Sequence, residues 1–252
     1  MKHNALRALV IVIALALALS SLGASGARQT GARVQAAQAK GTQGPCPTGN
    51  EEVPAKTALE KLKAGNVRWQ SKMEERNWAD ERAANSPPKE QHPFAVVISC
   101  MDSRVPPELI FDRGLGEIFV IRVAAPVLNR DELASLEYAL VKKHVKLVVV
   151  LGHTDCGAVR GAVDKEKGRY LPALLYKIEP AIRYVSVRYN GGVRITSANQ
   201  KNLDRVSIAN ARIVHSQILN KRALRQPGVQ VKWGLYYLAS GEVAFDPADV
   251  AP

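Results

Sequence analysis

Two short clusters of side chains with metal-binding chemistry lie in the middle of this chain of 252 residues. Cys100 and Asp102 belong to the first cluster, Cys-Met-Asp-Ser-Arg, and His153 and Cys156 belong to the second, His-Thr-Asp-Cys-Gly. Two thiols and an imidazole suit a tetrahedral zinc ion. Three protein ligands leave its fourth position open, which is typical of catalytic zinc sites. We therefore predict a zinc site made by Cys100, His153 and Cys156.

The fourth polar side chain, Asp102, has two possible partners. It stands two residues after Cys100, so its carboxylate could bind the zinc ion and close the site. Arg104 offers a competing bidentate, charge-assisted hydrogen bond. If Arg104 holds Asp102, the fourth position stays free for a water molecule, whose pKa zinc lowers to about 7. We expect Asp102 to ligate zinc only in a closed, inactive state. A structural zinc site is the alternative, but it has no use for this aspartate–arginine pair.

Strand patterns lead into both clusters. Residues 94–100 and 147–151 are short, continuous, β-branched apolar runs, as expected of strands that are covered on both faces. A third such run covers 118–122, and helical patterns cover 131–143 and begin again at Cys156. This alternation predicts a mostly parallel sheet with right-handed crossovers. Ligands in such sheets gather outside the carboxyl ends of the strands, so the two clusters should share one crevice if their strands are neighbours.

The remaining elements are predicted to flank this sheet. An amphipathic helix runs from Thr57 towards Arg76, residues 168–192 suggest a helix and then a loop, and residues 206–224 suggest a further helix. Residues 231–243 suggest two short strands in an edge hairpin. The fold class is therefore α/β, a mostly parallel central sheet flanked by helices, with an N-terminal helical arm and a C-terminal edge strand or hairpin.

The N-terminus has the pattern of a secretory signal peptide. Basic residues precede an apolar run over 8–19, and the small residues 25–27 suit cleavage. The run is too short to span a bilayer comfortably, although an uncleaved anchor is the alternative reading. We expect a signal peptide over 1–27, a flexible linker over 28–50 and a catalytic domain over 51–252. The mature protein would be periplasmic or secreted, with no stable membrane insertion.

The composition excludes some classes of protein. With 46% hydrophobic and 23% charged residues, neither wholesale disorder nor a polytopic membrane protein is expected. The formal net charge of +12 could attract nucleic acid or small anions. No nucleic-acid motif accompanies that charge, so we predict no nucleic-acid partner and assign the basic side chains to a solvated or subunit-contacting surface.

The cysteine count supports metal binding over disulfide bonding. Three cysteines are an odd number and a poor disulfide framework. Export would place their thiols in an oxidising compartment, where zinc would protect Cys100 and Cys156. Cys46 is left over, either as a spare thiol or in an intermolecular disulfide. His92, His144 and His215 have no partner visible in the sequence, and His215 is a remote candidate for proton transfer.

The combined motifs resemble those of the β-class carbonic anhydrases. The resemblance rests on Cys-x-Asp-Ser-Arg-Val-Pro over 100–106 and His-Thr-x-Cys-Gly-Ala over 153–158, and extends to Gly-Asn-x-Arg-Trp over 65–69. It covers about Ala58 to Phe245. It implies reversible hydration of carbon dioxide to bicarbonate and a proton through zinc-bound hydroxide, with one Zn²⁺ in each subunit.

The resemblance also implies a substrate pocket and an oligomer. By position, Gln91 and the backbone amide of Gly157 would hydrogen-bond the substrate. Phe119 and Tyr138 would line an apolar pocket for CO2, at least one of them from a neighbouring subunit. A homodimer or homotetramer is expected. Two alternatives stay open: a CS2 or COS hydrolase on the same scaffold, and a catalytically silent zinc-binding relative.

Two departures from the family pattern lead to further expectations. Residues 122–126, Arg-Val-Ala-Ala-Pro, replace the usual Gly-Asn or Ala-Asn after the second strand, so the hydrogen bonding of this loop should differ. Val97 and Ser99 stand where a bicarbonate-regulated subgroup has tryptophan and glycine. We therefore predict that this bicarbonate switch is absent.

Overall fold

A five-stranded sheet forms the centre of the fold in a computed structural model, which describes residues 52–71 and 90–249. The strands are β1 (Ala95–Cys100), β2 (Ile118–Val123), β3 (Leu147–His153), β4 (Gln230–Tyr236) and β5 (Val243–Phe245). Their order is β2-β1-β3-β4-β5; the first four are parallel and β5 runs antiparallel to β4. The predicted mostly parallel sheet with a C-terminal edge strand is confirmed. The predicted signal peptide, the linker and Cys46 lie outside the described residues.

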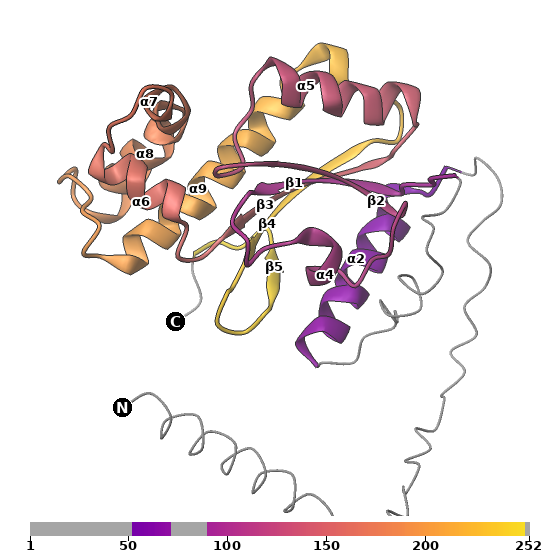
Figure 1. Ribbon diagram of the computed structural model, residues 1–252, viewed down its shortest axis with the longest axis horizontal. Helices are drawn as coiled ribbons and strands as arrows, with labels where there is room; N and C mark the ends of the chain where they lie inside the picture. The colour runs from indigo at the N-terminus through magenta and orange to yellow at the C-terminus, as the bar shows by residue number, and fades with distance from the viewer. Residues whose placement is uncertain (1–51, 72–89, 250–252) are drawn as a thin grey trace, which may run out of the picture. The chain divides into compact units, whose positions relative to one another are not determined.

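Helices cover both faces of the sheet (Figure 1). They are α2 (Ala55–Gln70), α4 (Pro107–Ile110), α5 (Arg130–Glu137), α6 (Gly157–Asp164), α7 (Leu171–Leu175), α8 (Glu179–Tyr189) and α9 (Gln200–Leu219). Two apolar clusters result: one packs α5 and α9 against Val148 and Val150, and the other packs α2 against Val97 and Val149. These residues alternate along β1 and β3, as the two-residue period of a strand requires. The described residues include no helix with the length and hydrophobicity of a membrane span.

The positions of β1 and β3 explain their composition. Each has a parallel neighbour on both sides and is buried along its whole length. Val97 pairs with Val149 and Ser99 with Leu151, so the two strands run side by side in one direction. Their carboxyl ends therefore meet at one edge of the sheet, with Cys100 at the end of β1 and His153 at the end of β3.

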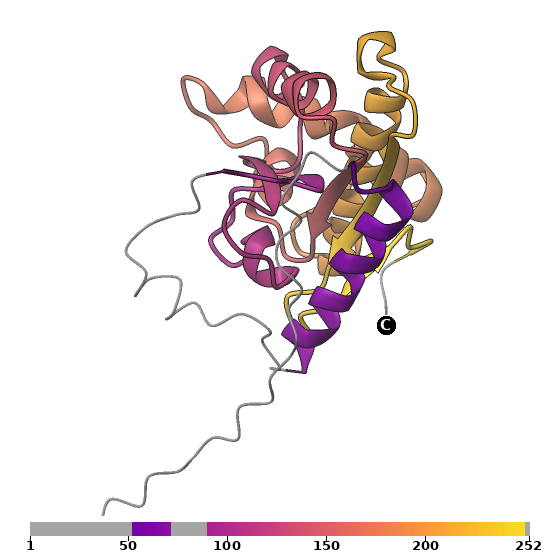
Figure 2. The ribbon, with the colours of Figure 1, turned by 90° about the vertical axis from the view of Figure 1, so that its right-hand side faces the viewer.

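The motif Gly-Asn-x-Arg-Trp docks α2 onto the sheet, and Figure 2 shows this helix from a second side. A Cβ atom at Gly65 would lie 1.8 Å from the carbonyl oxygen of Phe111, so only glycine permits this close approach. The buried Asn66 amide donates to the carbonyl of Gly241 at 2.8 Å, and its oxygen accepts from the backbone N–H of Val243 at 2.8 Å. Thus α2 is fastened to the segment that joins β4 and β5.

Several predicted boundaries differ from the structure. Helix α9 begins at Gln200, six residues before the predicted start, because its first turn is polar and carries no apolar period. Residues 168–192 form α7 and α8 rather than one helix and a loop. Helix α2 covers Ala55–Gln70, and residues 72–76 of the predicted extension lie outside the described residues. The predicted edge hairpin is confirmed, since β4 and β5 are consecutive, pair antiparallel and end the sheet; β4 in addition pairs with β3 in parallel.

Candidate metal centre

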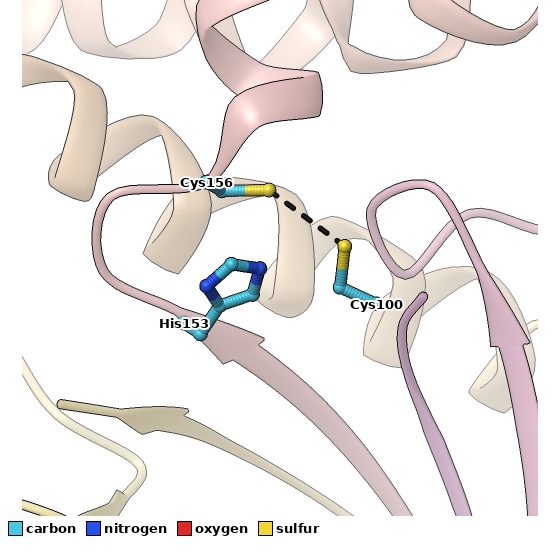
Figure 3. Close-up of side chains that lie close together, drawn as sticks. All are labelled: Cys100, His153 and Cys156. Carbon is cyan, nitrogen blue, oxygen red and sulfur yellow. Dashed lines mark hydrogen bonds between the residues drawn. The ribbon is translucent and has the colours of Figure 1, made fainter. Parts of the chain in front are cut away.

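The structure brings the three predicted ligands together. Cys100 ends β1, His153 ends β3, and Cys156 caps the N-terminus of α6 (Figure 3). One ligand atom from each lies within 4.8 Å of the others, and all three side chains are buried. Asp102 does not belong to this group. The adjacent parallel strands supply two ligands, and the turn after β3 supplies the third.

The geometry of the three side chains fits a zinc ion. The sulfur atoms of Cys100 and Cys156 are 3.9 Å apart. Two sulfurs about 2.3 Å from a tetrahedral zinc ion would be separated by about 3.8 Å. The Nδ1 atom of His153 lies 2.9 Å from the carbonyl oxygen of Thr154, so this nitrogen carries the proton and donates it. The Nε2 atom is buried without a hydrogen-bonding partner in the described part of the chain, and a metal ion would satisfy its lone pair.

In the absence of metal, the pKa of one thiol is lowered and the pKa of the other is raised. A hydrogen bond from Cys156 lowers the pKa of Cys100 to about 4 against the opposing effect of burial. That same hydrogen bond, and then burial, raise the pKa of Cys156. The backbone amides of Val159 and Ala158 act in the opposite direction, because the N-terminus of α6 favours negative charge on the Cys156 sulfur. Cys100 is therefore the more acidic thiol of the pair.

Arg104 holds Asp102 with both oxygens engaged. Its Nε atom donates to Oδ1 at 3.0 Å and its Nη2 atom to Oδ2 at 2.8 Å, while its backbone N–H also donates to Oδ1 at 3.0 Å. The side-chain hydrogen bond from Arg104 lowers the pKa of Asp102 to about 2. The carboxylate is thus ionised at neutral pH and paired with arginine.

The loop after β2, which departs from the family pattern in sequence, contacts the first cysteine. The backbone N–H of Ala125 donates to the sulfur of Cys100 at 3.2 Å. The guanidinium of Arg122 donates to the carbonyl oxygens of Cys100 at 2.9 Å and Asp102 at 2.6 Å. Ala125 has φ of 60°, the left-handed conformation that costs a non-glycine residue about 1–2 kcal/mol. The departure from the family pattern therefore falls on a residue that orients a ligand.

The predicted substrate residues lie in two separate places. Gly157 begins α6 directly after Cys156; it is exposed, and a Cβ atom there would meet nothing within 4 Å. Gln91 precedes β1, and Phe119 is the second residue of β2, so both are near the amino ends of the strands. The six residues of β1 place these ends about 17 Å from the carboxyl edge that carries Cys100. Gln91 and Phe119 are therefore not brought to the metal ligands of the same chain.

Phe119, on the edge strand β2, and Tyr138, directly after α5, lie together. Their ring centroids are 6.4 Å apart in an edge-to-face arrangement. With Val120, Ile121 and Ala134 they line an open depression of about 640 Å³. Tyr138 begins a π-helical turn that follows α5, and half of its surface is exposed. β2 has no second strand neighbour among the described residues, and this exposed, mostly apolar face has the chemistry of a subunit contact.

The structure corrects the expected burial of Met101 and gives the position of His215. Met101, whose apolar side chain would by default be assigned to the core, is 63% exposed, because it follows the last residue of β1. His215 places Nε2 3.1 Å from the carbonyl oxygen of Val231, near the amino end of β4. Tyr236, at the other end of that strand, pairs with His153. His215 is therefore not beside the metal ligands.

Comparison with known proteins decides the family. The family model for carbonic anhydrase matches residues 95–243, which is more than half of the chain. This chain belongs to the β-class carbonic anhydrase family. Carbonic anhydrase 2 of Mycobacterium tuberculosis is 38% identical over 128 residues, which make up 48% of this chain and 61% of that relative. Carbonic anhydrase of Synechococcus elongatus is 34% identical over 172 residues, 62% of this chain and 60% of that relative. The chain spans about three-fifths of the length of these curated relatives.

Solved β-carbonic anhydrases share the fold of this family member. One of two tetrameric β-carbonic anhydrases from the filamentous ascomycete Sordaria macrospora has a TM-score of 0.57 at 22% identity, covering 78% of this chain and 100% of that one. The Coccomyxa β-carbonic anhydrase in complex with acetazolamide has a TM-score of 0.54 at 25% identity, covering 69% of this chain and 83% of that one. The α/β fold predicted from the sequence is thus confirmed by known members of the family.

Proposed function

We propose that this protein binds one zinc ion per subunit and catalyses the reversible hydration of CO2 to bicarbonate and a proton. Membership of the β-class supports the reaction. The observation that carries the proposal is the buried group of Cys100, His153 and Cys156, with the Nε2 atom of His153 aimed at the two sulfurs and Asp102 held elsewhere by Arg104. Three protein ligands, with the possible fourth ligand Asp102 kept off the metal by Arg104, suit a catalytic site better than a structural one.

Each side chain has a distinct role in this proposal. Cys100, His153 and Cys156 would hold the metal. Zinc bound there would supply the Lewis acidity that makes a water molecule a usable nucleophile near neutral pH. Asp102 would accept a hydrogen bond from that nucleophile and orient it. With a pKa of about 2, Asp102 stays ionised and cannot keep the proton at neutral pH, so the proton passes on to solvent or buffer.

The N-terminus of α6 would bind the negative charge that develops on the substrate oxygens. Gly157 is the first residue of this helix, directly after Cys156, and a Cβ atom at this position would meet nothing within 4 Å. Helix N-termini favour anions through their free amides and dipole. Preorganised backbone donors of this kind stabilise charge that develops in a transition state.

The pocket is proposed to be completed by a second subunit. Gln91, Phe119 and Tyr138 would contribute to a neighbouring chain's metal centre, which their position near the far end of the strands in their own chain supports. A homodimer or homotetramer would result. We also propose that the protein is exported to the periplasm or secreted, on the basis of the signal-peptide pattern over 1–27.

Stopped-flow measurement of CO2 hydration by the zinc-loaded protein tests the reaction. The expected result is hydration that scales with zinc content and is lost in Cys156→Ala, which should release the metal. Hydrolysis of CS2 and COS is measured on the same preparation. A folded protein with one zinc per subunit that hydrolyses these substrates but does not hydrate CO2 contradicts the proposal and supports the alternative hydrolase.

Subunit mixing tests the shared pocket separately. Oligomers made only of Cys156→Ala chains, or only of chains carrying both Phe119→Ala and Gln91→Ala, should have low activity. If the pocket is shared, mixed oligomers should regain part of the wild-type activity, since some sites then pair intact ligands with an intact neighbouring pocket. No gain upon mixing, with mixed oligomers demonstrated by mass, contradicts a shared pocket.

A further inference from the structure

Arg104 joins the two loops that carry the metal ligands. While its Nε and Nη2 atoms hold Asp102, its Nη1 atom donates to Oδ2 of Asp155 at 3.2 Å and its Nη2 atom donates to the carbonyl oxygen of Asp155 at 3.1 Å. Asp155 lies between His153 and Cys156 in the second cluster. The orientation of the guanidinium is therefore determined from both loops.

Asp155 is itself anchored from outside the metal centre. Its backbone N–H donates to Oδ1 of Asp204, on α9, at 2.8 Å. The same oxygen of Asp204 accepts from the side-chain amide of Gln200 at 2.8 Å. Arg160, on α6, donates to Gln200 at 2.7 Å and to Oδ1 of Asp155 at 3.4 Å. These contacts form a closed ring that connects the ligand loop to two helices.

The ring has a physical consequence for Asp102. About half of the Arg104 side chain is exposed. An exposed ion pair contributes little by itself, since the entropy lost on ordering long side chains offsets its Coulomb attraction. Contacts with Asp155 order the guanidinium before Asp102 binds to it. Without them Arg104 would sample other orientations, and the Asp102 carboxylate would more often be free to reach the nearby metal position.

We propose that Asp155, anchored by Asp204, is a positioning residue that holds Arg104 so that Asp102 stays off the metal and the fourth position remains open. This inference deepens the proposed function and rests on it for the presence of a metal at Cys100, His153 and Cys156.

Anion binding to the cobalt-loaded full-length protein tests the proposal without measuring turnover. Thiocyanate that enters the open position changes the visible spectrum of the ion, so a titration gives its dissociation constant. Asp155→Gly removes the carboxylate but keeps both backbone groups, and glycine readily adopts the φ of 52° at this position. The dissociation constant should rise about tenfold, the lower end of the usual effect of losing a group that orients a metal site.

A second substitution tests whether Asp102 is the cause. Asp102→Asn in the Asp155→Gly background should restore wild-type thiocyanate binding, because a neutral amide competes poorly for the metal. A crystal structure of metal-loaded Asp155→Gly should place an Asp102 oxygen about 2.0–2.2 Å from the ion. Asp204→Ala acts from α9, outside the ligand loop, and should weaken thiocyanate binding in the same direction by a smaller factor.

Asp246→Gly is a matched control. Asp246 also has positive φ (51°), is also half-exposed and also pairs with a cation, Lys232, at 3.9 Å. It follows β5, outside the ring, so the control should bind thiocyanate as the wild type does. Unchanged binding in metal-loaded Asp155→Gly and Asp204→Ala overturns the proposal, as does weakened binding that Asp102→Asn does not reverse. If the spectra behave as expected but the zinc protein does not hydrate CO2, the positioning role stands and the proposed reaction fails.

Discussion

Replacing Gly65 with alanine should undock α2 from the sheet. The new Cβ atom would lie 1.8 Å from the carbonyl oxygen of Phe111 and 2.6 Å from its carbonyl carbon. Both are backbone atoms at the end of α4, so no side-chain rotation can relieve the overlap. Restoring an ordinary contact of 3.4 Å requires a shift of about 1.6 Å (3.4 minus 1.8). The helix cannot move so far and keep its present contacts.

The cost follows from the hydrogen bonds of the next residue. Outside its own helix, the Asn66 side chain makes three hydrogen bonds at 2.8–3.1 Å, with Ile110, Gly241 and Val243, and two of them are buried. A shift of about 1.6 Å breaks them, and each is worth about 1–1.5 kcal/mol, or more where a buried group stays unpaired. Alanine's higher helix propensity returns about 1 kcal/mol. The free energy of unfolding should therefore fall by about 3 kcal/mol.

Urea denaturation of Gly65→Ala, with Gly161→Ala as the matched control, measures this effect. Gly161 is a buried glycine inside α6, but a Cβ atom there meets only the flexible carboxylate of Glu166, at 3.0 Å. The control should be nearly neutral or slightly stabilised. Equal stability of Gly65→Ala and wild type would refute the close-approach argument, and equal loss in both variants would show that the effect is not specific to the α2 contact.

Three further predictions concern the metal centre. Asp102→Ala should keep its zinc, measured by metal content, but its rate of CO2 hydration, measured by stopped flow, should fall by about 100-fold or more. The control Asp246→Ala should keep both its zinc and its rate. An unchanged rate in Asp102→Ala removes Asp102 from the mechanism. Because folding lowers the pKa of Asp102 from 3.8 to about 2, its contribution to stability is present above about 4 and is lost as the pH falls towards 2. The difference in unfolding free energy between metal-free wild type and Asp102→Asn should shrink over that range, and a constant difference contradicts the assigned cause. Ala125→Gly should raise the free energy of unfolding by about 0.5–1 kcal/mol, since relief of the left-handed conformation exceeds glycine's extra freedom in the unfolded chain; a loss of stability contradicts this.

The strands and the metal ligands were predictable because their causes are local. A strand buried on both faces needs a continuous apolar run, and β1 and β3 have one. Two cysteines and a histidine at or just after the ends of such runs supply the donor set of a zinc site. The parallel arrangement then follows from the alternation with helices. The predicted sheet and the grouping of Cys100, His153 and Cys156 needed no knowledge of distant contacts.

The features that the sequence did not reveal depend on distant contacts or on backbone conformation. Helix α9 begins with a polar turn because Asp204 bonds to the ligand loop and Gln200 bonds to Arg160 on α6, so this turn lacks the apolar period by which a helix is recognised. The pairing of β4 with β5 was predicted as a hairpin, but the parallel pairing of β4 with β3 joins residues about 80 positions apart and is not disclosed by the composition of β4. The left-handed conformation of Ala125 is invisible in sequence, because alanine is not a residue that favours it.

The difference between local causes and distant contacts also limits what the ligand motif can predict about whether the fourth metal position is open. Cys-x-Asp-x-Arg allows two arrangements, with Asp102 on the metal or on Arg104, and its spacing permits both. In this chain Arg104 is ordered by Asp155, and Asp155 is anchored by an aspartate 49 residues away. Two chains with identical ligands could therefore differ in whether the fourth position is open. An accurate inference of an open site from sequence would have to include α9 as well as the two ligand clusters.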